Sequence, residues 1–171
     1  MEIVELFFML LIAVALLAWS IGLLASVFIG SPFVPTPYTI VDQLLTLTRV
    51  GKGDIVYDLG SGDGRILISA AKKGAMAIGW EINPILVVWT IISSLFAGVK
   101  GYVKVNVSDY RGAPLYDATV IVVYSLPERL YEIEKMIRKQ CKRGTRIISY
   151  RFPLQTFTPK QQKNGIYLYR L

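Results

Sequence analysis

The chain has 171 residues, enough for one domain and a short additional segment, and its formal net charge is +7. It contains no histidine, which excludes Ser-His-Asp and Cys-His catalysis and most zinc sites, so we expect no bound metal. A single cysteine, Cys141, excludes an internal disulfide, as expected for a protein domain in a reducing compartment.

The N-terminal segment is apolar. Residues 6–29 carry no charged side chain, and as a helix they would be about 36 Å long at ~1.5 Å per residue. This length is enough to cross a ~30 Å hydrocarbon core with some tilt. A cleaved signal peptide is the alternative, but it has a basic region before a shorter apolar core, whereas Glu2 and Glu5 precede this one. We predict that residues 1–30 form an uncleaved, single-pass transmembrane anchor.

A proline-rich linker, residues 31–37, follows the predicted anchor. Each proline fixes its own φ angle and favours an extended conformation for the residue before it, so the linker is expected to be a stiff spacer. Thr36 is a candidate N-cap of a helix, with Pro37 at the first helical position. The remaining residues, 38–171, form the predicted methyltransferase domain described below.

The stretch from Ile55 to Arg65 contains the pattern around which the chain is organised. A short apolar β run, residues 55–59, is followed by a turn with alternating glycines and then by the apolar spacing of a helix. A strand, a glycine turn and a helix in this order form the nucleotide-binding corner of an open parallel sheet. Glycines permit positive φ angles there and let a ligand approach the backbone closely.

The spacing of the glycines separates two classes of ligand. A dinucleotide fingerprint, Gly-x-Gly-x-x-Gly, would need a third glycine at the position of Arg65. The sequence instead reads Asp-x-Gly-x-Gly-x-Gly, with Asp58 near the end of the strand. A carboxylate there would repel a pyrophosphate but attract the amino group and sulfonium of S-adenosylmethionine (SAM). A glycine-rich turn without a ligand is the other interpretation, and we predict a SAM site.

Two further acids follow the next predicted strands. Glu81 comes directly after a strand at 75–80, where a ribose-binding carboxylate is expected. Asp109 follows a strand at 102–107 and could accept a hydrogen bond from the adenine amino group, with Tyr110 covering the ring. A surface glutamate and a turn-capping aspartate are the alternative interpretations.

The helix predicted at 84–97 is apolar around nearly its whole circumference, where one stripe would suffice for a surface helix. Asn83 is its predicted N-cap and Pro84 its first residue. Such a helix is either buried on both sides, or contacts lipid, the anchor or another chain through its outer face.

The remaining elements complete an α/β domain. The run 118–124 is fully apolar, as in a strand buried on both faces of a parallel sheet. Ser125 to Glu128 has the form of a capping box for the next helix, and the basic residues late in that helix are either a solvated face or a contact for anionic lipid. Strands at 146–152 and 166–170 follow, separated by a connector too short for another helix and strand. We predict a Rossmann-like sheet with helices on both faces.

Five segments together resemble one family of SAM-dependent methyltransferases. They are Phe33-Val-Pro-Thr-Pro37, Asp58-Leu-Gly-Ser-Gly-Asp-Gly-Arg65, Glu81-Ile-Asn-Pro84, Tyr124-Ser-Leu-Pro127 and Arg151-Phe-Pro153. The family comprises membrane-anchored class I (seven-β-strand) protein-lysine methyltransferases, including the mitochondrial enzymes that modify the c-ring protein of ATP synthase and the adenine nucleotide translocase. Archaeal protein-lysine methyltransferases are its close relatives. The glycine corner alone indicates only a class I methyltransferase, and the Phe-Val-Pro and Arg-Phe-Pro segments narrow the resemblance.

The resemblance implies roles for particular residues. Thr36, Tyr124 and Pro127 would border the methyl-transfer channel and are the candidate catalytic residues. The candidate cofactor-binding residues are Asp58, Gly60, Ser61, Gly62, Asp63, Gly64, Glu81, Ile82, Asn83, Asp109 and Tyr110. The short segment after Phe152 departs from fuller domains of the class and offers no insertion that could read a substrate sequence.

The implied function is methylation of a lysine on a membrane or membrane-proximal protein, with the lipid bilayer as a partner of the N-terminal helix. Because SAM is cytosolic, the domain would face the cytoplasm, or the matrix of an organelle. Methylation of a lipid or lipophilic small molecule, and a non-enzymatic SAM-binding membrane module, are the alternatives. Nucleic acid is not expected, because Tyr124-Ser-Leu-Pro127 replaces the Asn/Asp-Pro-Pro-Tyr/Phe motif of base methyltransferases.

Overall fold

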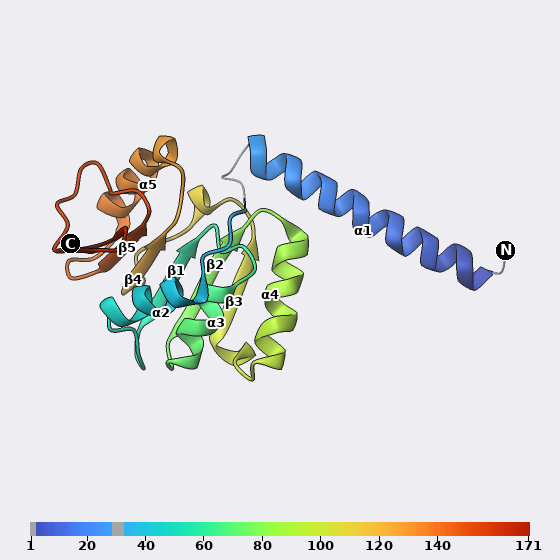
Figure 1. Ribbon diagram of the computed structural model, residues 1–171, viewed down its shortest axis with the longest axis horizontal. Helices are drawn as coiled ribbons and strands as arrows, with labels where there is room; N and C mark the ends of the chain where they lie inside the picture. The colour runs from blue at the N-terminus through green and yellow to red at the C-terminus, as the bar shows by residue number, and fades with distance from the viewer. Residues whose placement is uncertain (1–2, 29–32) are drawn as a thin grey trace.

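The domain is built on a seven-stranded sheet with the strand order β3-β2-β1-β4-β5-β7-β6 (Figure 1). The computed structural model describes the backbone of residues 3–28 and 33–171, so residues 29–32 of the predicted anchor and linker lie outside the described residues. The parallel strands are β1 (Ile55–Leu59), β2 (Met76–Glu81), β3 (Val103–Val107), β4 (Val120–Val123) and β5 (Arg146–Tyr150). The strand β7 (Ile166–Arg170) runs antiparallel to both β5 and β6 (Gln161–Lys163). The predicted Rossmann-like sheet is confirmed.

Helices cover both faces of the sheet because successive strand residues point to opposite sides. In β1, Val56 belongs to a core shared with α2 (Tyr38–Leu47) and α3 (Arg65–Lys72). The next residue, Tyr57, belongs to a second core shared with α5 (Pro127–Gln140). The helix α4 (Pro84–Phe96) packs beside α3 and against β2 and β3. All four residues of β4 are buried, as the apolar run predicted.

The strand order places the reversal of the chain between β1 and β4, since β2 and β3 lie on one side of β1 and β4 on the other. In open α/β sheets, ligands bind outside the carboxyl ends of the strands at this reversal. The glycine turn after β1 and the acids after β2 and β3 all lie at this edge, and the pocket described below is found there.

Two predicted helix caps are wrong. Pro37, with φ −56° and ψ 142°, occupies the N-cap position of α2, so Thr36 lies outside the helix and caps nothing. Leu126 is the N-cap of α5, and neither cap position has a side-chain hydrogen bond, so Ser125 forms no capping box. In both cases a proline falls within one residue of the helix start, where its fixed φ favours the entry without a capping side chain.

The prediction also missed the short strand β6. Asn164 and Gly165 have φ angles of +51° and +71° and connect it to β7, with Lys163 paired to Ile166. Positive φ at both central residues is the requirement of a type I′ hairpin turn. All three residues of β6 are exposed and polar, so the strand has no apolar alternation to reveal it.

The connector between β5 and β6 is held against α5 by a buried carboxylate. Glu134 is 1% exposed and accepts hydrogen bonds from the backbone N–H groups of Gln155, at 2.5 Å, and Thr156, at 2.8 Å. The hydroxyl of Tyr169 accepts a further hydrogen bond from the Leu154 N–H at 2.8 Å. These contacts fix the connector without a helix.

The helix α1 (Ile3–Phe28) extends away from the domain (Figure 1). Residues 3–22 are long and apolar enough to cross a membrane, and none of that span is buried, although a signal sequence would meet the same criterion. Its contact with the domain is at the start of α4, where Gly22 lies against the side chain of Asn83.

Candidate active site

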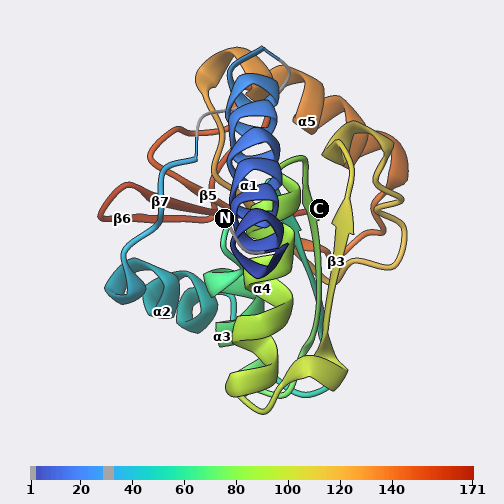
Figure 2. The same ribbon diagram turned by 90° about the vertical axis from the view of Figure 1, so that its right-hand side faces the viewer.

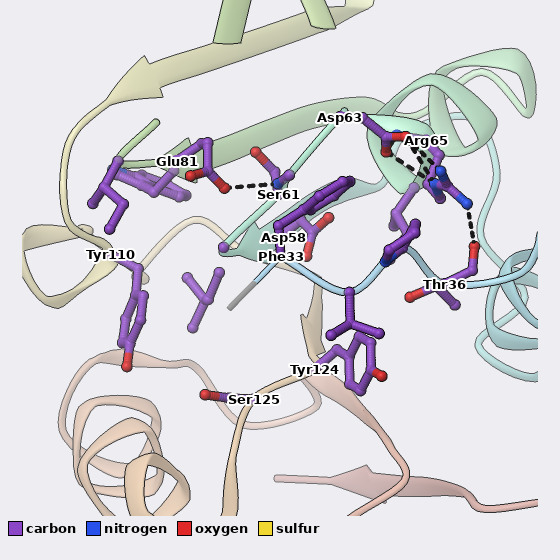
Figure 3. A pocket seen from close by; sticks show the side chains of 18 of the residues that line it. Phe33, Thr36, Asp58, Ser61, Asp63, Arg65, Glu81, Tyr110, Tyr124 and Ser125 are labelled. Carbon is purple, nitrogen blue, oxygen red and sulfur yellow. Dashed lines mark hydrogen bonds and ion pairs between the residues drawn. The ribbon is translucent and has the colours of Figure 1, made fainter. Parts of the chain in front are cut away.

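A cavity of about 190 Å³ lies at the carboxyl ends of β1, β2 and β4 (Figure 3). It brings together most of the residues singled out from the sequence, although they come from distant segments. The predicted residues that line it are Thr36, Asp58, Gly60, Ser61, Gly62, Asp63, Glu81, Ile82, Asp109, Tyr110 and Tyr124.

Three predicted site residues do not line the cavity. Gly64 begins α3, and a Cβ at this position would lie 2.3 Å from the methyl group of Thr90 in α4, so its role is close helix packing. Asn83 is buried, and its side chain accepts a hydrogen bond from the Ile85 N–H at 3.0 Å, which confirms the predicted cap. Pro127 begins α5, directly after the lining residue Leu126.

Other lining residues were missed as site residues. They are Phe33, Val34, Pro35, Leu59, Arg65, Ile66, Trp80, Ser108, Ser125, Leu126, Arg151 and Phe152. The linker residues among them were interpreted as a spacer, whereas they form a wall of the cavity. Proline restricts the linker backbone, but no local pattern shows which distant surface that backbone lies on.

The glycine turn has the conformation that its sequence requires. Gly60, Gly62 and Gly64 have φ angles of +93°, +55° and +76°. The N–H groups of Gly60 and Ser61 both donate to the carbonyl of Trp80 at 3.0 Å, which fastens the turn to β2. A Cβ at Gly62 would lie 2.6 Å from the Phe33 ring, so glycine also allows the linker to close over the turn.

Asp58 is the most distinctive group in the cavity. Its side chain is 3% exposed, and its carboxylate has no hydrogen-bond or ion-pair partner within residues 3–28 and 33–171. Burial raises the pKa of Asp58 well above its ordinary value, and the nearby carboxylates of Glu81 and Asp63 raise it further. A buried carboxylate without a partner is costly, so this position favours a ligand that supplies a cation.

Glu81 is held in a fixed orientation. One carboxylate oxygen accepts the N–H of Gly62 at 2.9 Å, and the other accepts the N–H of Asn83 at 2.8 Å. Each oxygen keeps a lone pair that can accept from a ligand hydroxyl. The buried hydroxyl of Ser61 has no partner within the described residues and is a further unsatisfied group beside the turn. A cation near Asp58 and a diol near Glu81 are features of SAM, so the residues fit this cofactor.

Asp109 caps a turn, as its alternative interpretation stated. Its carboxylate accepts the Arg111 N–H at 2.8 Å and pairs with the Arg111 guanidinium, at the start of the 3₁₀ helix η2 (Tyr110–Gly112). Burial acts to raise the pKa of Asp109, but the hydrogen bonds from Arg111 outweigh it and the pKa is lowered. Asp109 and Tyr110 line the cavity, and an adenine contact there stays a prediction.

Arg65 fastens the linker to the glycine turn. It donates to the carbonyl of Thr36 at 2.7 Å and to the carboxylate of Asp63 at 2.9 Å, while its guanidinium lies 5.1 Å from the centre of the Tyr38 ring. Thr36 is therefore buried by a contact with a residue 29 positions away rather than by a helix cap.

Aromatic side chains form the wall on the far side of the cavity from Glu81 (Figure 3). The rings of Tyr124 and Tyr150 pack with their centres 5.1 Å apart, and Phe152 lies in the same lining. Arg151 adopts a φ of +68° and donates its N–H to Gly165 at 2.8 Å. An aromatic wall can hold a cationic amine through its ring faces and still desolvate the neutral form.

Comparison with known proteins decides the family. The family model described as the ANTKMT methyltransferase domain matches residues 58–161. The chain belongs to this family. The matched range runs from the buried Asp58 to the start of β6 and includes the sheet edge that carries the cavity. The resemblance drawn from the sequence motifs is confirmed.

Curated members of this family are similar to the chain over most of its length. The human lysine N-methyltransferase of the ATP synthase c-ring protein is 35% identical over 128 residues, which is 75% of this chain and 54% of that protein. The mouse adenine nucleotide translocase lysine N-methyltransferase is also 35% identical, over 129 residues and 56% of its length. The chain thus spans about half the length of these animal relatives. A protein-lysine N-methyltransferase of Saccharolobus islandicus (strain REY15A) is 34% identical over 132 residues, 76% of this chain and 82% of that protein.

Solved structures share the fold. One is described as an RNA methyltransferase from Salinibacter ruber in complex with S-adenosyl-L-homocysteine, with a TM-score of 0.75 and 36% identity. The match covers 80% of this chain and 92% of that chain. A SAM-dependent methyltransferase from Thiobacillus denitrificans, 21% identical with a TM-score of 0.60, shows the fold alone.

Proposed function

We propose that the chain is a SAM-dependent protein-lysine N-methyltransferase that acts on membrane or membrane-proximal proteins. The observation that carries the proposal is the buried, unpaired carboxylate of Asp58 beside the glycine turn and the oriented carboxylate of Glu81. The relatives named as lysine N-methyltransferases support the choice of acceptor, and a neighbour solved with S-adenosyl-L-homocysteine supports the cofactor.

The cofactor-binding residues divide the ligand between them. Asp58 would hold the amino group of the methionine part, and Glu81 the two ribose hydroxyls. Asp109 would accept from the adenine amino group, with Tyr110 and Ile82 beside the ring. Because the N–H groups of Gly60 and Ser61 are already bonded to β2, the turn offers shape more than hydrogen-bond donors.

When bound, SAM supplies an electrophilic methyl group on a sulfonium. The acceptor lysine must lose its proton, and with a free pKa of ~10.4 only about one lysine in 2,500 is neutral at pH 7. The aromatic wall of Tyr124 and Phe152 would favour the neutral amine by excluding water. Alignment of the amine by Thr36, Tyr124 and the start of α5 at Pro127 would then contribute most of the rate, and the proton can leave to water.

The membrane assignment rests on α1. We propose that residues 1–30 anchor the chain in a bilayer, with the domain on the cytoplasmic side or in the matrix of an organelle, where SAM is available. The length and the apolar, unburied surface of residues 3–22 support this placement. All Lys and Arg residues follow position 48, on the domain side of the helix.

The test is the transfer of radiolabelled methyl from SAM into a membrane extract, separated into protein, lipid and RNA fractions. We expect label in protein, recovered as methyl-lysine after hydrolysis, and no label with the Asp58→Asn chain. Label in the lipid fraction would instead establish the second candidate, which the exposed apolar side chains of α4 favour. Label in RNA, or SAM binding without transfer to any fraction, would contradict the proposal.

A further inference from the structure

The helix α4 presents an apolar surface to the outside of the domain. Its inner side is buried through residues such as Leu86 and Val87, whereas Phe96 at its end is 87% exposed. We define the α4 face by its exposed side chains, Val88, Trp89, Ile91, Ile92, Leu95 and Phe96. An exposed apolar patch of this kind on a folded domain marks an interaction surface. The first of the two sequence interpretations, burial on both sides, is therefore wrong.

The position of α1 shows what the α4 face meets. At the contact of the two helices, a Cβ on Gly22 would lie 2.6 Å from the side chain of Asn83. From there α1 runs outward on the side of the domain that α4 covers, crossing in front of α4 rather than lying along it (Figures 1 and 2). A bilayer crossed by α1 would therefore face α4, with α4 lying close to the membrane plane.

The dimensions of α4 suit the membrane interface rather than the membrane interior. Its 13 residues extend about 20 Å at ~1.5 Å per residue, which is too short for a ~30 Å hydrocarbon core. A helix with one apolar face can instead lie in the interface plane, with that face about 5–10 Å into the boundary of headgroups and acyl chains. Trp89 supplies the aromatic residue that such interfaces favour.

The charges around α4 are complementary to anionic lipid. The domain elements packed against it are α3, β2, β3 and the 3₁₀ helix η1 (Lys100–Tyr102). Their exposed charged residues are the lysines Lys72, Lys100 and Lys104, while the acid among them, Glu81, is buried in the cavity. A basic border around an apolar face adds electrostatic attraction to headgroups.

We propose that the α4 face inserts into the boundary of headgroups and acyl chains in the leaflet next to the domain. This inference rests on the proposed role of α1 as an anchor. Glu81 of the cavity lies three residues before Pro84, the start of α4, so the seated helix would hold the site close to the membrane surface. The substrate class is thereby narrowed to lysines at headgroup level.

The three tryptophans allow a direct test in the full chain. Trp19 is on α1, Trp89 is in the α4 face, and Trp80 is 6% exposed inside the domain. We would reconstitute the Trp19→Phe chain into phosphatidylcholine and phosphatidylglycerol vesicles with brominated acyl chains. Because bromine quenches only tryptophan that reaches the acyl region, about half of the Trp89 emission should be lost. The Trp19→Phe/Trp89→Phe chain, which keeps only Trp80, should show little quenching.

The Trp89→Phe chain separates the inference from the proposal on which it rests. In this chain Trp19 reports on α1, so quenching of Trp19 without quenching of Trp89 would overturn the α4 inference and leave the anchor. Quenching of neither tryptophan would overturn both, whereas methyl transfer to a soluble lysine peptide reports on the cofactor chemistry alone. Trp89 shielded by a second copy or a protein partner would be unquenched at every protein-to-lipid ratio and would also overturn the inference.

A second variant links the surface to activity. Ile92→Asp places a charge in the α4 face, and Tyr131→Asp places the same charge at an exposed position of α5 as the matched control. We expect Ile92→Asp to abolish the quenching of Trp89 and to slow methylation of membrane acceptors several-fold, with an unchanged rate on a soluble peptide. Quenching and membrane rates equal to those of Tyr131→Asp would contradict the inference.

Discussion

At the scale of single residues, the site depends on acids that differ in what satisfies them. Glu134 and Asp109 are held by hydrogen bonds from the chain itself. Asp58 is as deeply buried as the core, and its carboxylate has no such bond among the described residues. An arrangement of this kind lowers the stability of the free protein and is offset when a cationic ligand binds.

This difference predicts how stability depends on pH. The pKa of Asp58 is raised by burial and by Glu81 above its ordinary value of 3.8, so the folded state holds the proton more tightly than the unfolded state. Stability is therefore fully present below about pH 4 and falls as the pH rises through the raised pKa. In the absence of SAM, Asp58→Asn should be more stable than the natural chain at pH 7–8, by about 1–3 kcal/mol. Thermal unfolding in detergent measures this, and an equal difference at pH 4 would contradict it.

Cys141 gives a second prediction from a single residue. Burial raises the pKa of its thiol to about 11, compared with an ordinary value of 9.0. Between pH 7 and 8 the folded chain should hold about a hundredfold less thiolate at this position than an unfolded chain. Alkylation by iodoacetamide should therefore be slow when folded and fast in denaturant. Equal rates in the two states would show that the thiol is not shielded by the fold.

At the scale of elements, the connector between β5 and β6 depends on Glu134. Glu134→Ala would leave the buried N–H groups of Gln155 and Thr156 without their acceptor, at a cost of about 2–4 kcal/mol. The exposed Glu132 on the same helix provides the control, and Glu132→Ala should cost less than about 0.5 kcal/mol. Chemical denaturation of both chains measures the difference. A similar loss for both would show that the connector is not held by this carboxylate.

The elements also show which features a sequence can predict. The strand, turn and helix around Gly60 were predictable because one local pattern specifies all three, and the cap at Asn83 because its bond spans two residues. The strand β6 lacked an apolar pattern, and only the Asn164-Gly165 pair, a hairpin signal in itself, marks its end. The cap expected at Thr36 failed because a proline at the helix start took its place.

The site shows the same division between local and distant contacts. Most cofactor-binding candidates line the cavity because each directly follows a strand of the parallel sheet, and all such ends meet at one edge. The wall formed by Phe33 could not be predicted, because it depends on an Arg65 bond to the Thr36 carbonyl between segments distant in the sequence. Packing of this kind has no local pattern.

At the scale of the whole molecule, three features meet at one end of α4. The helix α1 contacts it at Asn83, the cavity is lined by Glu81 just before it, and the linker returns over the glycine turn through Phe33. The proposed anchor, the proposed membrane-facing helix and the cofactor site are thus parts of one connected region. In this arrangement, the fold itself would select lysines by their depth at the membrane.

The central claim is that this cavity binds SAM through Asp58 and Glu81. The most direct test is calorimetric titration of SAM into the full chain in detergent and into folded Asp58→Asn and Glu81→Gln chains. We predict binding to the natural chain and a loss of about tenfold or more in affinity for each variant, because each removes a charge-assisted contact worth about 1.5–3 kcal/mol. Unchanged affinity in both folded variants would contradict the account.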